Sequence, residues 1–460
     1  MRLDSGSPDF GNEATGDDRH MSDETAVVAD GSNAGNRRAE PSPTRGPAVT
    51  IAAGVRDGQL LPGRIAADAM LGFAAACRES NALGAVPTHQ VMVEAARVAR
   101  RVDLDMLPLA GVPVGVERTA PVEAGHSVVT RLQDAGAVIV GLAGASADNP
   151  FGRGAVACNP WNTARVAGGA AGAAVAAGLV PVACDGGDGE ARVAAAHCGV
   201  FAIEPGRYRG VDASACATMV EAGVLATTVD DAALVLAALA VRQDLADVDP
   251  PGRLRIGVAV DPPSRLIRVD RHWRAAARRA ASIAAVAGHA VGSTVLPHDD
   301  PTFAVLVRRL ASGAHDCSAP SRSTRLARRA AQWVGDLVCP DQIDRVEAHL
   351  LEFFDRYDVL ITPTVAAPPP PSRPRQLYRR SAKLLADMRS SPFIPLWNLV
   401  GWPTASVPMG VHPRSRTPVA AQLVGPPGSE STLLRLSAQM QAHRPWQRTV
   451  SRGSAAGVRR

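Results

Sequence analysis

The sequence predicts an α/β domain whose central β-sheet has many strands of mixed orientation and is covered by α-helices. Two observations lead to this expectation. Segments with helical periodicity alternate with short apolar segments typical of strands along most of the 460 residues. The composition, with 46% hydrophobic and 20% charged residues, is that of a globular protein with a large core. We find no internal repeat, and the length allows one large α/β domain or two to three average ones.

The first half of the chain begins the alternation. Helices are expected at residues 63–79, 88–102, 128–136 and 168–179, and over the run that follows Glu190 and ends at Cys198-Gly199. Strands are expected at residues 109–116, 137–144 and 179–184.

The second half of the chain continues the alternation of predicted helices and strands. Helices are expected at residues 227–243, 271–288, 341–357 and 430–443, and in a stretch that begins at residue 302. Strands are expected at residues 253–260, 290–296, 358–367, 405–411 and 418–425. Thr228 and Asp231 have the spacing of a capping box, which marks a helix start. The proline-rich residues 366–375 are expected to form a loop.

Composition divides the chain into three parts. Residues 1–48 are rich in Asp, Ser, Gly, Asn and Pro and are expected to be disordered. Residues 49–448 are expected to form the folded domain, and residues 449–460 a basic flexible tail. Met1 and Met21 both remain possible starts of the protein.

Charge and cysteine content exclude several classes of function. The net charge is +5, but the positive residues are scattered arginines and Lys383 is the one lysine, so we expect no nucleic-acid surface. The seven cysteines form no C-x-x-C pair, which argues against a disulfide framework and a structural zinc site. We expect no bound cofactor. Without an apolar leader or a run of about twenty apolar residues, we expect a cytoplasmic protein that does not bind membranes.

Seven segments, in their order along residues 60–448, resemble the amidase signature family. These segments are LAGVPVGV, RLQDAGAVIVG, NPFGRGAVACNPWNTARVAGG, ARVAAAHCGVFAIEP, YDVLITPTVAAPPPP, LWNLVGWPTASVPMGV and PVAAQLVGPPGSESTLLRLSAQMQ. The family consists of serine hydrolases that cleave amide C–N bonds with a Ser–cis-Ser–Lys triad. The resemblance implies a single domain with a mixed sheet wrapped by helices.

The same resemblance places other residues at all three triad positions. The strand that ends in Val-Lys-Asp in the family reads GVPVGVER here, which puts Glu117 at the lysine and Arg118 at the aspartate. Ala170 stands at the cis-serine, in a shortened GGAAG loop. Alignment on Arg192 puts Glu190 at the nucleophile. Lys383 lies in the distal C-terminal part and cannot replace the base.

The turn before Glu190 supplies the oxyanion donors in the family. Here it reads DGGDG and is longer than in the family, with Gly186, Gly187, Asp188 and Gly189 as candidate pocket residues.

Three hypotheses follow. We favour an inactive amidase-like protein with a binding or regulatory role, because serine acylation needs a hydroxyl and a neighbouring base. In the second hypothesis, Glu117 and Glu190 share a proton and perform acid–base chemistry, or hold a divalent cation. Residues near enough to join such an ion are Asp185, Asp188 and His197. In the third, a shifted nucleophile keeps amidase activity; the candidates are Cys184, Ser146 and Cys198, none with a recognisable base.

The remaining marked residues are expected to be structural. His197 follows a run of alanines and is predicted to be packed in the core rather than to bind a ligand. Arg192 is predicted to form a buried ion pair, with Asp185 as a candidate partner. Trp397 and Asn398 match a packing motif of the family. The partners we expect are a small amide-like ligand, a protein, or a second copy of the chain in a homodimer.

Overall fold

The structure is a computed structural model that describes residues 46–76, 84–118, 128–144, 157–185, 190–206, 222–297, 340–372 and 389–450. These residues all belong to one compact unit. Residues 1–45 of the predicted disordered segment, the tail from residue 451 and the predicted helix from residue 302 lie outside the described residues. Residues 366–372 of the proline-rich segment belong to no named helix or strand, as the predicted loop requires, and residues 373–375 lie outside the described residues.

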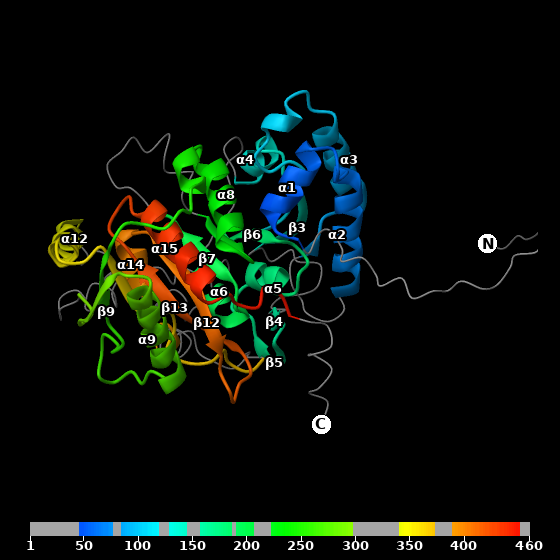
Figure 1. The fold of residues 1–460 in the computed structure, drawn as a ribbon. Coiled ribbons are helices and arrows are strands. Elements are labelled where there is room, and N and C mark those ends of the chain that lie inside the picture. Colours follow the sequence, from blue (N-terminus) through cyan, green and yellow to red (C-terminus); the bar gives the residue numbers. More distant parts are fainter. Residues whose placement is uncertain are drawn as a thin grey trace, which may run out of the picture. The chain divides into compact units, whose positions relative to one another are not determined.

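An eleven-stranded sheet forms the centre of the fold (Figure 1). Its strands are β1 (Gly84–Ala85), β2 (Pro113–Arg118), β3 (Val138–Gly144), β6 (Val182–Asp185), β7 (Phe201–Glu204), β8 (Gly223–Ala226), β9 (Arg255–Val258), β10 (Ala290–Ser293), β11 (Val359–Pro363), β12 (Thr404–Val411) and β13 (Pro418–Val424). Two short strands, β4 (Cys158–Asn159) and β5 (Asn162–Val166), form a separate hairpin.

The sheet is mixed, which confirms the predicted fold class. The strand order is β1-β3-β2-β6-β8-β7-β12-β13-β11-β9-β10. Pairing is parallel from β3 through β2 to β6 and again from β11 through β9 to β10, while the strands from β6 to β11 pair antiparallel. The parallel parts follow from the helix that connects each strand to the next, as the alternating sequence predicts.

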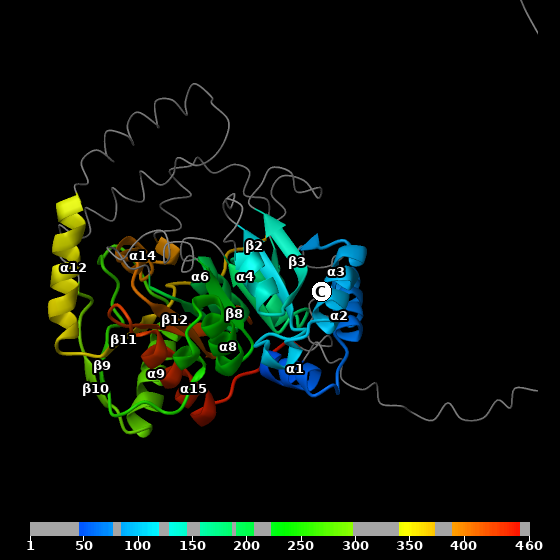
Figure 2. The same cartoon turned by 90° about the horizontal axis from the view of Figure 1, so that it is seen from above.

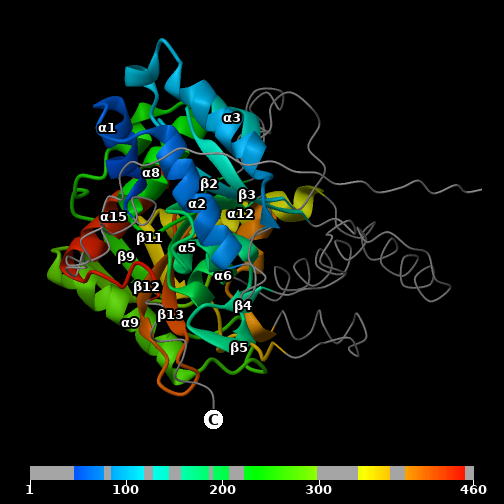
Figure 3. The ribbon, with the colours of Figure 1, turned by 90° about the vertical axis from the view of Figure 1, so that its right-hand side faces the viewer.

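The helices of the described part are α1 (Ala48–Arg56), α2 (Pro62–Ala76), α3 (Thr88–Ala99), α4 (Val128–Asp134), α5 (Ala170–Ala176), α6 (Glu190–Cys198), α8 (Val229–Ala240), α9 (Arg271–Val286), α12 (Pro340–Phe354), α14 (Pro395–Val400) and α15 (Glu430–His443). Short 3₁₀ turns occur at Leu104–Met106 and Gln243–Ala246. Figure 3 shows α2 and α3 packed together over β2 and β3.

Alternate residues of β11 face two different apolar clusters. In β11, Val359 and Ile361 belong to the larger cluster, whereas Leu360 between them belongs to the smaller one, which also holds Phe354 and Trp397. This is the period of two of a strand with both faces buried. Figure 2 accordingly shows α9 and α15 on one side of the strands and α14 on the other.

The structure confirms most of the elements expected from periodicity and adds several. Thr228 caps α8, since its side chain accepts a hydrogen bond from the Asp231 N–H at 3.2 Å, as the capping-box spacing predicts. Helix α1 and strands β7 and β8 were not among the expected elements. In the part of the chain that the structure describes, no helix is long and apolar enough to cross a membrane.

Gly223 in β8 lies where a side chain cannot fit, and we expect Gly223→Ala to destabilise the protein by about 1–3 kcal/mol. A Cβ there would lie 2.5 Å from the Cβ of Ala191 in α6 and 3.1 Å from the Cγ of Glu204. The matched control is Gly292→Ala in β10, where an added Cβ meets nothing within 4 Å. Urea unfolding of both variants tests this expectation, and equal midpoints would contradict it.

Candidate functional site

Strands β2 and β6 bring the first site candidates to one edge of the sheet. The two strands are parallel neighbours, and Glu117 at the end of β2 is the register partner of Asp185 at the end of β6. The chain leaves β6 toward the turn 186–189 and enters α6 at Glu190. Because the ends of parallel strands share one edge, Glu117 and the start of α6 follow adjacent strand ends.

Glu117 contacts the beginning of α5. Its Oε2 accepts a hydrogen bond from the Ala171 N–H at 2.8 Å, and the Ala170 N–H also donates to this carboxyl group. The first N–H groups of a helix lack partners within the helix and carry partial positive charge. The Glu117 carboxyl group therefore caps α5 at the position where the resemblance places the bridging serine.

Burial and these N–H donors shift the pKa of the Glu117 carboxyl group in opposite directions. Burial raises the pKa of the carboxyl group above its ordinary value, while the hydrogen bonds from Ala171 and Ala170 lower it. The raising effect is the larger of the two. A carboxyl group in this setting cannot act as the neutral amine base that the family mechanism uses.

The backbone at the start of α5 packs directly against α6. A Cβ at Gly169 or at Gly172 would lie 2.9 Å from the Cβ of Ala194, and Gly168 has a φ of 91°. Glycine is the residue that allows such an approach and such a φ without strain. The glycines before and inside α5 therefore fix the distance between the two helices that carry Ala170 and Glu190.

Several predicted site residues, or their side chains, lie outside the part of the chain that the structure describes. The structure gives the backbone of Glu190 at the start of α6 but not its side chain. The turn of Gly186, Gly187, Asp188 and Gly189 lies outside the described residues, as do Ser146 and Lys383 and the side chain of Arg118. The predicted carboxylate pair and the predicted oxyanion turn therefore stay predictions.

The structure argues against Cys184 and Cys198 as shifted nucleophiles. Both side chains are fully buried. Burial and the charge of Asp185 raise the pKa of the Cys184 thiol to about 12, and burial and the charge of Glu117 raise that of Cys198 further. The Cys198 thiol donates to the Ala167 carbonyl at 3.4 Å. A nucleophilic cysteine needs a lowered pKa and access to substrate, and these thiols have neither.

Arg192 is buried and forms a buried ion pair, as predicted, and the partner in this pair is Glu204. Its Nε lies 2.7 Å from Oε2 of Glu204. Its two terminal nitrogens donate to the side-chain oxygens of Gln422, at 3.0 Å, and of Asn398. Arg192 therefore joins α6 to β7, β13 and α14 within the core.

His197 is packed in the core, in agreement with its predicted structural role. Its side chain is almost completely buried, and burial lowers its pKa to about 4. The ring contacts Trp273 edge to face, with centroids 6.5 Å apart. A neutral buried imidazole is typical of a core residue.

Two residues that sequence reasoning missed fix the end of α6. Asn159 donates to the His197 carbonyl at 2.8 Å, and the Trp161 indole donates to the Cys198 carbonyl at 2.7 Å. The last carbonyls of a helix have no partners within it, so these donors cap α6. The segment CNPWN carries two side-chain donors in a short turn, and this is the signal that could have indicated a cap.

Comparisons with known proteins complete this description. The family model described as Amidase matches residues 109–336 and 339–434. The "Putative amidase AmiB2" of Mycobacterium bovis is 33% identical over 421 residues, covering 78% of this chain and 88% of that protein. The 6-aminohexanoate-cyclic-dimer hydrolase of Paenarthrobacter ureafaciens is 29% identical, covering 63% of this chain and 69% of that protein.

A solved structure shares the fold. A 6-aminohexanoate cyclic dimer hydrolase complexed with substrate superposes with a TM-score of 0.71 at 22% identity, covering 88% of this chain and 98% of that one.

Proposed function

Because this chain belongs to the amidase family, we propose that it is a catalytically inactive member that keeps the scaffold for a binding or regulatory role. The observation that carries the proposal is Glu117. Its carboxyl group is engaged by the first N–H groups of α5, and the resemblance assigns this residue to the position of the family's catalytic lysine. In this proposal Ala170 and Glu190 complete the loss, since neither can act as a serine.

The size of the expected loss follows from the chemistry of serine hydrolases. Removing the nucleophile or the base of such an enzyme lowers kcat by a factor on the order of 10⁶. An alanine cannot relay a proton, and a carboxylate is a poor nucleophile toward an amide carbonyl. Replacement of all three groups leaves only binding and any remaining oxyanion donors.

The ligand that we propose is a small amide-like molecule or a protein partner, and a homodimer is the proposed assembly. The support for a small amide comes from the names of two relatives, "Putative amidase AmiB2" and "6-aminohexanoate-cyclic-dimer hydrolase".

An alternative is an active hydrolase of small carboxamides. It would act through a Glu117/Glu190 carboxylate pair, supported by the raised pKa of Glu117, or through Ser146 as a shifted nucleophile. The burial of Cys184 and Cys198 removes the other two candidates of that alternative.

A panel of amide and ester substrates tests the proposal on the purified full-length chain. We expect no hydrolysis above the rate in buffer, including on the cyclic dimer of 6-aminohexanoate, and no labelling by serine- or cysteine-directed probes. The Paenarthrobacter hydrolase serves as the positive control. Turnover that disappears in Glu117→Ala or Glu190→Ala would overturn the proposal in favour of the carboxylate pair, and labelling of Ser146 in favour of the shifted nucleophile.

Unfolding of the Glu117 variants provides the matched structural control. Glu117→Gln retains an oxygen acceptor for the α5 N–H groups, whereas Glu117→Ala leaves them without one, so only the alanine variant should lose about 1–2 kcal/mol.

A further inference from the structure

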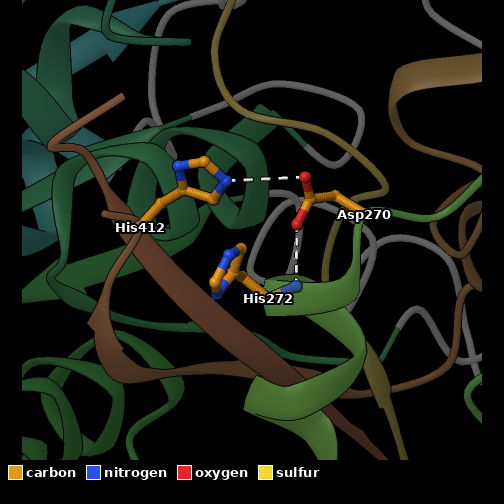
Figure 4. Close-up of side chains that lie close together, drawn as sticks. All are labelled: Asp270, His272 and His412. Carbon is orange, nitrogen blue, oxygen red and sulfur yellow. Dashed lines mark hydrogen bonds and ion pairs between the residues drawn. The ribbon is translucent and has the colours of Figure 1, made fainter. Parts of the chain in front are cut away.

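A second cluster of polar side chains lies where α9 begins and β12 ends (Figure 4). Asp270 is the N-cap of α9, His272 lies in its first turn, and His412 follows the last residue of β12. One nitrogen or oxygen atom from each lies within 4.8 Å of the others. Imidazole nitrogens and carboxylate oxygens are the ligands that zinc and similar divalent ions prefer.

His412 has a buried ring nitrogen that makes no hydrogen bond. Its side chain is only 5% exposed, and its buried Nε2 has no hydrogen-bond partner. This nitrogen points at Oδ2 of Asp270 from 3.5 Å, which is long for a hydrogen bond. Two ligand atoms on one tetrahedral zinc ion, each bound at 2.0–2.1 Å, lie about 3.3 Å apart. The gap between His412 and Asp270 therefore matches the separation of two ligands on one ion.

The other two residues are held in place around this gap. Oδ1 of Asp270 accepts the backbone N–H of His272 at 2.7 Å, which fixes the carboxylate and leaves Oδ2 facing His412. The rings of His272 and His412 meet edge to face, with centroids 4.7 Å apart. One ion would draw together three ligand atoms that already lie within 4.8 Å of one another.

From this geometry we propose that Asp270, His272 and His412 bind one divalent metal ion of the zinc class, which clamps the start of α9 to the end of β12. Helix α9 packs on β11, β12 and β13, so the ion would stabilise this part of the sheet. Three protein ligands leave at least one position for water. The site is separate from the one formed by Glu117 and α5, and its proposal does not depend on the proposed function.

Two hydrogen bonds must be exchanged when the ion binds. The Ser415 N–H donates to Nδ1 of His412 at 3.1 Å, which places the proton of the neutral ring on Nε2. Metal binding at Nε2 moves that proton to Nδ1 and releases the Ser415 N–H. The Nε of Arg271 donates to Nε2 of His272 at 3.2 Å in an exposed contact that is easily lost. These exchanges favour ions with high affinity for imidazole over Mg²⁺ and Ca²⁺.

Zinc and cobalt titrations of the tag-free, chelator-treated full-length chain test the proposal. We expect one equivalent of Zn²⁺ by calorimetry, visible d–d absorption with Co²⁺, and a Tm raised by roughly 3 °C when free Zn²⁺ is about 100 times Kd. Mg²⁺ should produce no such shift.

Two variants locate the ion. His272→Gln removes a half-buried ligand but keeps the backbone N–H that Asp270 caps, and Asp270→Asn keeps the cap but removes the charge. Each should weaken Zn²⁺ binding at least tenfold. The matched control is His349→Gln, because His349 is an exposed histidine whose Nδ1 lies 3.9 Å from Glu352. The proposal is overturned if the chain binds no Zn²⁺, or if either ligand variant binds it within threefold of the unsubstituted chain.

Discussion

Replacing Arg192 by methionine should lower the free energy of unfolding by about 3–5 kcal/mol, because the change removes one partner of a buried ion pair. The Arg192 side chain is 1% exposed and that of Glu204 is 14% exposed, so water cannot replace the lost partner well. Gln422 and Asn398 each lose a donor in the same step. Urea unfolding monitored by circular dichroism measures the loss.

A double-substitution cycle separates the ion pair from simple packing. Arg192→Met combined with Glu204→Met removes both charges, and this double variant should be markedly more stable than Arg192→Met alone, since an apolar pair of similar volume is tolerated in a core. Arg97→Ala is the exposed control: its partner Glu94 is one turn away and the side chain is 49% exposed, so the change should stay within about 0.5 kcal/mol. Equal losses for Arg192→Met and Arg97→Ala would contradict the structural role given to Arg192.

Long periodic elements of this fold could be predicted from sequence, while short central strands could not. Helix α9 alternates apolar and arginine positions over Arg271–Val286, and its buried residues form a stripe that includes Trp273. Strands β7 and β8 have four residues each and are almost completely buried on both faces. Four buried residues show no alternation, so pairing with the neighbouring strands, rather than local pattern, makes them strands.

In the candidate site, too, some features could be predicted from the sequence and others could not. The assignment of Glu117, Ala170 and Glu190 to the triad positions rests on the order of motifs and stays a prediction. The bond from Ala171 to Glu117 joins residues 54 positions apart and depends on how α5 packs against the end of β2. Likewise, Asp270 and His412 approach each other because α9 lies against β12. Side-chain contacts of this kind are set by tertiary packing and leave no periodic signal in the sequence.

The contact between Glu117 and the start of α5 offers a physical reason for a glutamate at this position. The beginning of a helix carries partial positive charge, which stabilises a carboxylate and disfavours an ammonium group. A lysine at the position of Glu117 would meet the N–H groups of Ala170 and Ala171 with the unfavourable charge. If the catalytic role is lost as proposed, an oxygen acceptor such as Glu117 suits these N–H groups, whereas an ammonium group would not.

His197 should make the stability of the protein fall between neutral pH and pH 4. Burial lowers the pKa of His197 to about 4 in the folded protein, whereas an unfolded histidine has a pKa of about 6.5. As the pH falls, the unfolded chain therefore takes up the proton first. The stabilisation is fully present above pH 6.5 and is lost as the pH falls toward 4, by roughly 3 kcal/mol in total.

Comparison with His197→Met isolates this contribution, because methionine fills a similar space without titrating. Relative to the variant, the unsubstituted chain should lose about 3 kcal/mol in free energy of unfolding from pH 7 to pH 4. Burial also raises the pKa values of Glu117 and Asp231, which stabilises the folded protein as the pH falls. Both carboxyl groups are present in the unsubstituted chain and in the variant, so their effect cancels in the comparison. A constant difference across this range would show that His197 takes up its proton in the folded protein as readily as in the unfolded one, and it would return His197 to the candidates for a ligand beside Glu190.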